Sequence, residues 1–129
     1  MENKQWYQKQ LRMVQTVMRE PDIVNYDAKA VVAYLEKAKS NCIIVNAGGI
    51  IDFFNSDIEL ANPNQFMTRE NVLGDLIEEA HKKNIKILVR VDFRGVQKFR
   101  YDQKPHWFAA NPDGSPKRNP QGLYSPCYN

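Results

Sequence analysis

Two short apolar runs, Cys42 to Gly49 and Ile85 to Phe93, dominate the middle of the chain. Each run starts with consecutive apolar residues and becomes polar only towards its C-terminal end, at Asn46 in the first and at Arg90 and Asp92 in the second. Short continuous apolar runs are typical of strands that are covered on both faces of a parallel sheet. The pattern therefore predicts two buried parallel strands.

A helical period precedes each of these runs. Asp27 is a good helix N-cap, and the stretch from about Asp27 to about Lys39 has apolar residues at the i, i+3, i+4, i+7 spacing of one helix face. A second stripe follows from about Asn71 to Lys83. The apolar members of the two stripes are Ala28, Val31, Val32 and Leu35, then Leu73, Leu76, Ile77 and Ala80.

An imperfect alternation from Leu11 to Glu20 predicts a further strand, which Pro21 ends. The order is then strand, helix, strand, helix, strand, which makes two βαβ units. Crossovers of this kind are almost always right-handed. We therefore expect one domain over residues 1–129, with an α/β fold and a three-stranded parallel sheet.

The two faces of the last strand differ. One face is wholly apolar and is expected to lie under the helices: Ile87, Val89, Val91 and Phe93. The other face starts apolar and ends charged: Leu88, Arg90 and Asp92. Such a gradient is typical of a strand that lines a (β/α)8 barrel, whose top layer opens into a pocket. The fold prediction is thus a partial TIM barrel with its first three βα units.

Two long segments show no clear period. One runs from Ile50 to about Arg69, and the other follows Phe93 and is rich in proline and glycine. Structureless segments of this length are uncommon in a compact domain unless they serve a function. The last residues, 124–129, resemble the start of a further strand.

Composition narrows the class of protein. Of the 129 residues, 43% are hydrophobic and 26% are charged, and the net charge is +3, as in ordinary globular domains. The basic residues form no block, so nucleic-acid binding is not expected. No apolar run approaches the roughly 20 residues of a membrane span, and the N-terminus does not resemble a secretory signal. We expect a cytoplasmic protein that binds no membrane.

Metal and cofactor motifs are not evident either. The two cysteines and two histidines do not have the spacing of zinc ligands. Gly48 and Gly49 do not fit the glycine-rich phosphate-binding patterns. The sequence therefore predicts neither a metal site nor a cofactor.

Three stretches resemble the N-terminal part of the hypothetical glycosyl hydrolase 6 family: YDAKAVVAYLEKAKSNCIIVNAGGIIDFF, LGDLIEEAHKKNIKILVRVDF and KPHWFAANPDGSP. That family is similar to (β/α)8-barrel glycoside hydrolases and, more distantly, to α-fucosidases and some β-galactosidases. The resemblance extends from about Arg12 to Asn129. One departure is His106, which stands where the family pattern suggests an acidic residue.

The resemblance implies a carbohydrate substrate and acid/base hydrolysis of a glycosidic bond. A whole barrel needs about 250 residues, so this chain would supply only its beginning. The acid/base and the nucleophile are then expected beyond Asn129, and the catalytic residues within the chain stay unknown. Glu20, Asp52 and Asp92 are the carboxylates expected at strand ends, and Asp92 is the weak catalytic candidate among them.

The expected substrate-binding residues are Arg19, Asn46, Arg90, Asp92, His106 and Trp107. Each has a simpler interpretation as well. Asp92 can form an ion pair with Arg90, Asn46 can satisfy the turn that follows it, and Trp107 can fix the long loop to the sheet. An exposed indole there can equally stack on a sugar ring.

Two alternatives to a glycosidase fragment remain at this stage. One is a non-catalytic carbohydrate-binding or assembly module with an α/β fold, and the other is a small self-standing α/β domain. Three strands cannot close a barrel, so the open sheet edges are expected to pair with the remainder of a barrel or with another copy of the chain.

Overall fold

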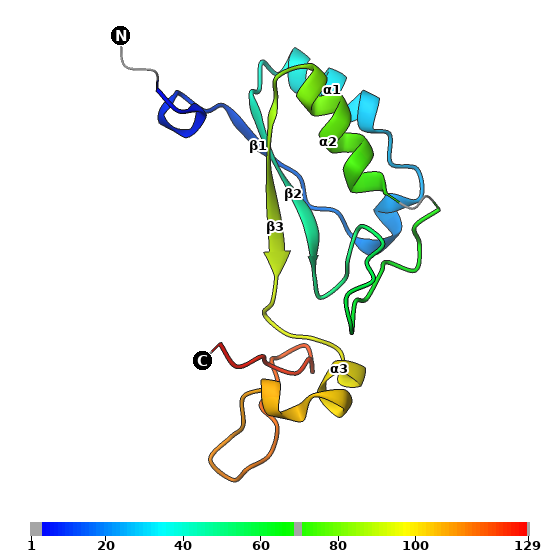
Figure 1. Cartoon of the computed structure of the whole chain (residues 1–129), viewed down its shortest axis with the longest axis vertical. Helices are drawn as coiled ribbons and strands as arrows, with labels where there is room; N and C mark the ends of the chain where they lie inside the picture. Colours follow the sequence, from blue (N-terminus) through cyan, green and yellow to red (C-terminus); the bar gives the residue numbers. More distant parts are fainter. Residues whose placement is uncertain (1–3, 69–70, 129) are drawn as a thin grey trace.

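The computed structural model describes residues 4–68 and 71–128 and has one three-stranded sheet (Figure 1). Its strands are β1 (Met13–Gln15), β2 (Cys42–Gly49) and β3 (Lys86–Asp92). They are ordered β1-β2-β3, and both neighbouring pairs are parallel. The predicted α/β fold with parallel strands is therefore confirmed.

The connecting helices are α1 (Ala28–Lys37) and α2 (Val72–Lys82), each close to its predicted range. Asp27 caps α1 by accepting a 3.1 Å hydrogen bond from the Ala30 N–H. Asn71 caps α2 in the same way through the Gly74 N–H, at 2.9 Å. Both caps satisfy N–H groups that have no partner within the first turn of a helix.

The main core lies between the sheet and the helices, which cover the same face (Figure 1). It combines the apolar stripes of α1 and α2 with one face of β2, and its most buried members are Leu35, Ile43, Val45, Leu76 and Ala80. These side chains have at most 1% of their surface exposed. Burial of this apolar surface is the main force that holds the βαβ units together.

The first strand is much shorter than predicted. It ends at Gln15, and the 3₁₀ turn η2 (Glu20–Ile23) takes up the last residue of the predicted range. Pro21 sets the backbone for this turn, where its missing N–H costs nothing. The turn directs Ile23, which is 1% exposed, into a second small core with Met18, Phe53 and Val72.

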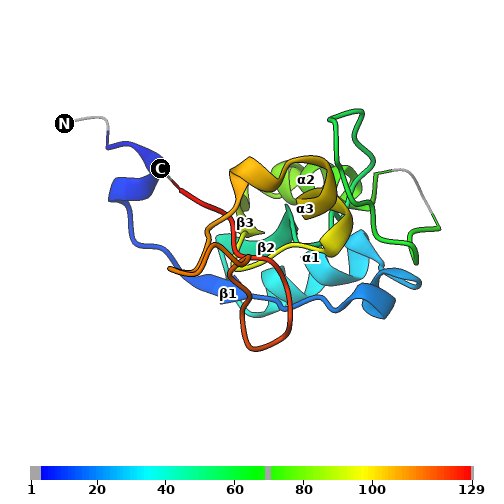
Figure 2. The same ribbon diagram turned by 90° about the horizontal axis from the view of Figure 1, so that it is seen from below.

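The C-terminal segment is ordered by turns and aromatic packing. It contains α3 (Lys98–Gln103) and the 3₁₀ turn η3 (Pro105–Trp107), and it lies at the carboxyl ends of the strands (Figures 1 and 2). The buried ring of Tyr124 stacks on Tyr101 with 4.4 Å between centroids. The guanidinium of Arg118 covers Tyr124 at 4.5 Å from its centroid.

The expected further strand at residues 124–129 is wrong for the residues that can be judged, since Asn129 lies outside the described residues. Tyr124 forms antiparallel bridges with Val96 and Arg118, and Pro126 forms one with Phe108. These are local pairings within the segment. The segment does return to the end of β3, where the Tyr128 hydroxyl donates to the Phe93 carbonyl, but it does not pair with β3 as a strand.

The apolar face of β3 is only partly covered. Ile87 packs against the main core as predicted, but the prediction is wrong for Val89, Val91 and Phe93, which are 53%, 46% and 52% exposed. The reason is topological. Helix α2 covers β2 and the start of β3, whereas α3 lies beyond the carboxyl end of the sheet (Figure 1).

Candidate functional site

A cavity of about 300 Å³ opens at the carboxyl ends of the strands, on the side of the sheet that α1 and α2 leave free. Four of the six predicted substrate-binding residues line it: Arg19, Asn46, Arg90 and Asp92. They come from the segment after β1, from β2 and from β3. The parallel register is what gathers them, because the carboxyl ends of parallel strands meet at one edge.

Asn46 and Arg90 are direct neighbours across the sheet. Their Cα positions are partners in the register of β2 and β3, and after them the register shifts by one residue, at Ala47. Such a bulge bends a strand and redirects its side chains, and it is frequent beside functional sites. Here it interrupts the pairing at Ala47, and the pairing resumes with Gly48 opposite Val91.

Only one end of the side-chain amide of Asn46 has a hydrogen-bond partner among the described residues. Its Nδ2 donates a 3.1 Å hydrogen bond to the Met18 carbonyl oxygen. Its Oδ1 is buried and has no hydrogen-bond partner among the described residues. Buried amide oxygens are normally paired, because an unpaired one costs about 1–3 kcal/mol. This oxygen is therefore the polar atom of Asn46 that no described residue satisfies.

Asp92 is held as a carboxylate. Arg94 donates to it through Nε and Nη2, the shortest contact being 2.7 Å, and Arg90 lies 3.3 Å away. The hydrogen bonds from Arg94, aided by the charge of Arg90, hold the pKa of Asp92 below its ordinary value. An ionised carboxylate accepts hydrogen bonds but donates none, so Asp92 does not fit a general acid.

Arg19 and Glu20 complete the rim on the β1 side. Arg19 pairs with Asp22 at 2.9 Å, and its side chain is largely exposed. Arg19 directly precedes the η2 turn, which sets the position of its backbone. The Glu20 carbonyl accepts a 2.9 Å hydrogen bond from Asn64, which ties the long loop after β2 to this rim. Glu20 is also among the residues that line the cavity.

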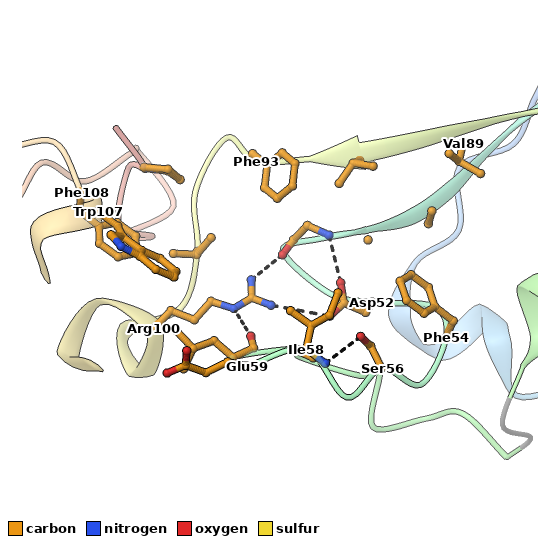
Figure 3. Close-up of a pocket in the computed structure, with 18 of the residues that line it drawn as sticks. Asp52, Phe54, Ser56, Ile58, Glu59, Val89, Phe93, Arg100, Trp107 and Phe108 are labelled. Carbon is orange, nitrogen blue, oxygen red and sulfur yellow. Dashed lines mark hydrogen bonds and ion pairs between the residues drawn. The ribbon is translucent and has the colours of Figure 1, made fainter. Parts of the chain in front are cut away.

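Asp52, a further predicted carboxylate, has a structural position. It is 8% exposed and accepts hydrogen bonds from the backbone N–H groups of Gly49 and Asn62, at 3.2 and 2.7 Å. Arg100 on α3 lies 3.7 Å from it (Figure 3). These contacts occupy the carboxylate, so Asp52 fastens the loop after β2. It does not line the cavity that contains Asn46, Arg90 and Asp92.

Arg100 was missed by the sequence argument. Its Nε donates to the Leu60 carbonyl at 2.7 Å and its Nη1 to the Gly49 carbonyl at 2.5 Å (Figure 3). Burial lowers the pKa of its guanidinium, and Asp52 opposes that shift. In the sequence, Arg100 is one basic residue in a segment without a clear period. Its partners lie some 40 to 50 residues earlier in the chain, so no local pattern indicates them.

The glycine pair after Asn46 permits the close approach of β2 and β3. Gly49 has φ +111°, and a Cβ placed on it would lie 2.1 Å from the Asp92 carbonyl oxygen. A Cβ on Gly48 would lie 2.6 Å from Asp52 Oδ1. Side chains at these positions would displace Asp92 or Asp52, so the two glycines position both carboxylates.

His106 and Trp107 are not brought into this cavity, since no described residue after Asp92 lines it. Both belong to η3, where their rings lie edge to face with centroids 6.1 Å apart. Trp107 is half exposed and lines a second, larger cavity of about 710 Å³ on the helix-bearing side of the sheet. Their role in sugar binding stays a prediction.

Among residues 4–68 and 71–128, no group of three or more His, Cys, Asp and Glu side chains could hold a metal ion. Within the same ranges, no helix has the length and apolar character needed to cross a membrane.

The parallel βαβ units, with Asn46, Arg90 and Asp92 around a cavity at their carboxyl ends, define the chain as an α/β protein. The sequence profile described as "Hypothetical glycosyl hydrolase 6" matches residues 27–129. The chain belongs to this family of glycosyl hydrolase-like proteins. A search of curated proteins found no match.

Among solved structures, the chain is similar to alpha-L-fucosidase isoenzyme 2 from Paenibacillus thiaminolyticus. The TM-score is 0.68 with 21% sequence identity, over 92% of this chain and 19% of the fucosidase chain. The likeness shows a shared fold. The chain spans about a fifth of the length of that enzyme.

Proposed function

We propose that this chain is the first part of a barrel-type glycoside hydrolase and forms one wall of its sugar pocket. The observation that carries the proposal is the gathering of Arg19, Asn46, Arg90 and Asp92 around one strand-end cavity. Family membership and the fold shared with a fucosidase support it.

In this proposal the wall binds and orients the sugar. Asn46, which lines the cavity, hydrogen-bonds one hydroxyl through its side-chain amide, and the Asp92 carboxylate accepts from another. Arg90, which lines the cavity and is partly exposed, donates to a ring or hydroxyl oxygen. Asp92 is held ionised and therefore does not supply the proton, and we expect the acid/base and the nucleophile in polypeptide that follows Asn129.

The test uses the complete protein that contains this chain and a panel of p-nitrophenyl glycosides, beginning with the α-L-fucoside. We expect hydrolysis of at least one substrate. Asn46→Ala and Arg90→Ala should each raise KM about tenfold, because each loses a hydrogen bond worth roughly 1.4 kcal/mol. Lys86→Ala, at the opposite end of β3, is the matched control and should leave KM unchanged.

Two results would contradict this function. Saturable sugar binding without any hydrolysis, weakened by Asn46→Ala, would assign the chain to a carbohydrate-binding module. An unchanged KM in both pocket variants of an active enzyme would remove the proposed wall from the substrate site.

A further inference from the structure

Two arginines, Arg90 and Arg94, contact the same carboxylate, that of Asp92. Arg90 and Asp92 lie two residues apart on β3, so their side chains share one face of the strand, and both residues line the proposed sugar pocket. Arg94 follows the strand and does not line that pocket. Arg94 therefore reaches Asp92 from outside the cavity, whereas Arg90 reaches it from within.

The two contacts differ in geometry. Nε of Arg94 lies 2.9 Å from Oδ1 of Asp92, and Nη2 of Arg94 lies 2.7 Å from Oδ2. The backbone N–H of Arg94 also donates to Oδ1, at 3.1 Å. Two parallel bonds from a guanidinium are a strong and specific way to hold a carboxylate. Arg90 makes a single, longer contact of 3.3 Å from Nη2, so Asp92 is engaged mainly by Arg94.

Arg90 consequently keeps unused hydrogen-bond donors. A guanidinium has several N–H groups, and the contact with Asp92 is the one printed by geometry for the Arg90 side chain among the described residues. Its side chain is 38% exposed and lines the cavity. Arg19, which also lines the cavity, is instead paired with Asp22 by two bonds of 3.2 and 2.9 Å. Arg90 is thus the better placed of these two arginines to donate to a ligand.

The backbone that carries Arg94 is fixed by the C-terminal segment. Val96, two residues further on, exchanges backbone hydrogen bonds of 2.8 and 2.9 Å with Tyr124. Gly95 permits this close packing, because a Cβ on it would lie 2.7 Å from Cβ of Leu123. The side chain of Arg94 is 76% exposed, but it extends from a backbone that is paired directly after it. This arrangement favours a constant direction of its guanidinium.

We propose that Arg94 is a positioning residue of the strand-end pocket, which holds the Asp92 carboxylate from outside and thereby keeps the guanidinium of Arg90 free to bind the ligand. Without Arg94, the same carboxylate would draw Arg90 into a two-bond pair, since both side chains lie on one face of β3. The binding groups of the pocket would then occupy each other. This inference rests on the proposed function, because the ligand is the sugar of that pocket.

The first test measures the accessibility of Arg90 in the complete protein without any sugar. Phenylglyoxal modifies free guanidinium groups, and peptide mapping by mass spectrometry gives the rate at Arg90. We expect Arg94→Ala to slow this rate about threefold, which corresponds to pairing with Asp92 about two thirds of the time. The rate at Arg19 is the internal reference and should not change. Lys98→Ala, which breaks an exposed ion pair outside the cavity, is the matched control.

The second test uses the p-nitrophenyl glycoside that the complete protein hydrolyses. Arg94→Ala should raise KM about fivefold and change kcat less than about twofold, because the loss concerns substrate binding. In an Arg90→Ala background, the same change should raise KM less than about twofold, because Arg94 acts through Arg90. A merely structural role of Arg94 would give the same factor in both backgrounds.

The exposed side chain of Arg94 makes loss of the fold unlikely to arise from its replacement, which circular dichroism checks. Arg94→Gln, which keeps much of the side-chain length without the charge, is a second variant and should behave like Arg94→Ala.

Two results would overturn the proposal. One is an unchanged rate of Arg90 modification in both Arg94 variants. The other is an equal rise in KM on Arg94→Ala with and without the Arg90 side chain. A slower reaction of Arg90 in a protein that hydrolyses none of the glycosides would support the relation between the two arginines and remove the sugar proposal alone.

Discussion

Asp52 and Arg100 form an ion pair that joins the loop after β2 to helix α3, with only 12% and 13% of their side chains exposed. The pair is more than a contact between two charges. Arg100 also donates to the carbonyls of Gly49 and Leu60, and Asp52 accepts from two backbone N–H groups. The C-terminal segment is thereby fixed at the carboxyl end of the sheet.

Arg100→Met should lower the free energy of unfolding by about 2–4 kcal/mol, because it leaves the Asp52 charge and two carbonyls without their partner. Lys98→Met on the same helix is the control. Its ion pair with Asp102 is exposed, so the change should cost less than about 0.5 kcal/mol. Urea unfolding measures both, and equal losses would show that the Asp52–Arg100 pair does not hold the segment.

Gly49→Ala should destabilise the protein by about 3 kcal/mol or more. The new Cβ would meet the Asp92 carbonyl at 2.1 Å, and φ +111° is strained for alanine. Gly114 also has a positive φ, but a Cβ there meets nothing within 4 Å, so Gly114→Ala should cost only about 1 kcal/mol. Thermal or urea unfolding compares the two, and a similar cost for both would refute the close approach of β2 and β3.

The contribution of Asp92 to stability should depend on pH. Its pKa is lower in the folded protein than the ordinary value of about 3.9, so the unfolded chain binds this proton more readily. The stabilisation is complete above about pH 5 and is lost as the pH falls through the folded pKa. Asp92→Asn should therefore cost about 0.5–1 kcal/mol near pH 7 and nearly nothing below both pKa values.

The measurement is the difference in unfolding free energy between the two proteins at several pH values. A difference that stays constant, or that grows towards acid, would contradict the arginine pairing of Asp92.

The two cysteines should differ sharply in reactivity. Cys42 is completely buried in β2, and its burial raises the pKa of the thiol, whereas Cys127 is exposed. A thiol reagent should therefore modify one thiol rapidly in the native protein and both after denaturation. Cys127→Ser should remove the rapid phase. A rapid phase that persists in this variant would place Cys42 in contact with solvent.

The sequence by itself determined the βαβ order, the cap of the first helix and the parallel sheet. These features depend on local patterns: the 3.6-residue period of α1 and α2, the capping residue Asp27, and the buried run of β2. It also indicated that Asn46, Arg90 and Asp92 would share a strand-end rim, because their order along parallel strands already implies that position.

Only the tertiary structure decided which long-range contacts form around those residues. The bulge at Ala47 and the Asp52–Arg100 pair join segments far apart in the chain, so no local period contains them. The same holds for the uncovered face of β3. Its alternation predicts an apolar surface, but which element covers that surface depends on packing in three dimensions, which a strand's own residues do not specify.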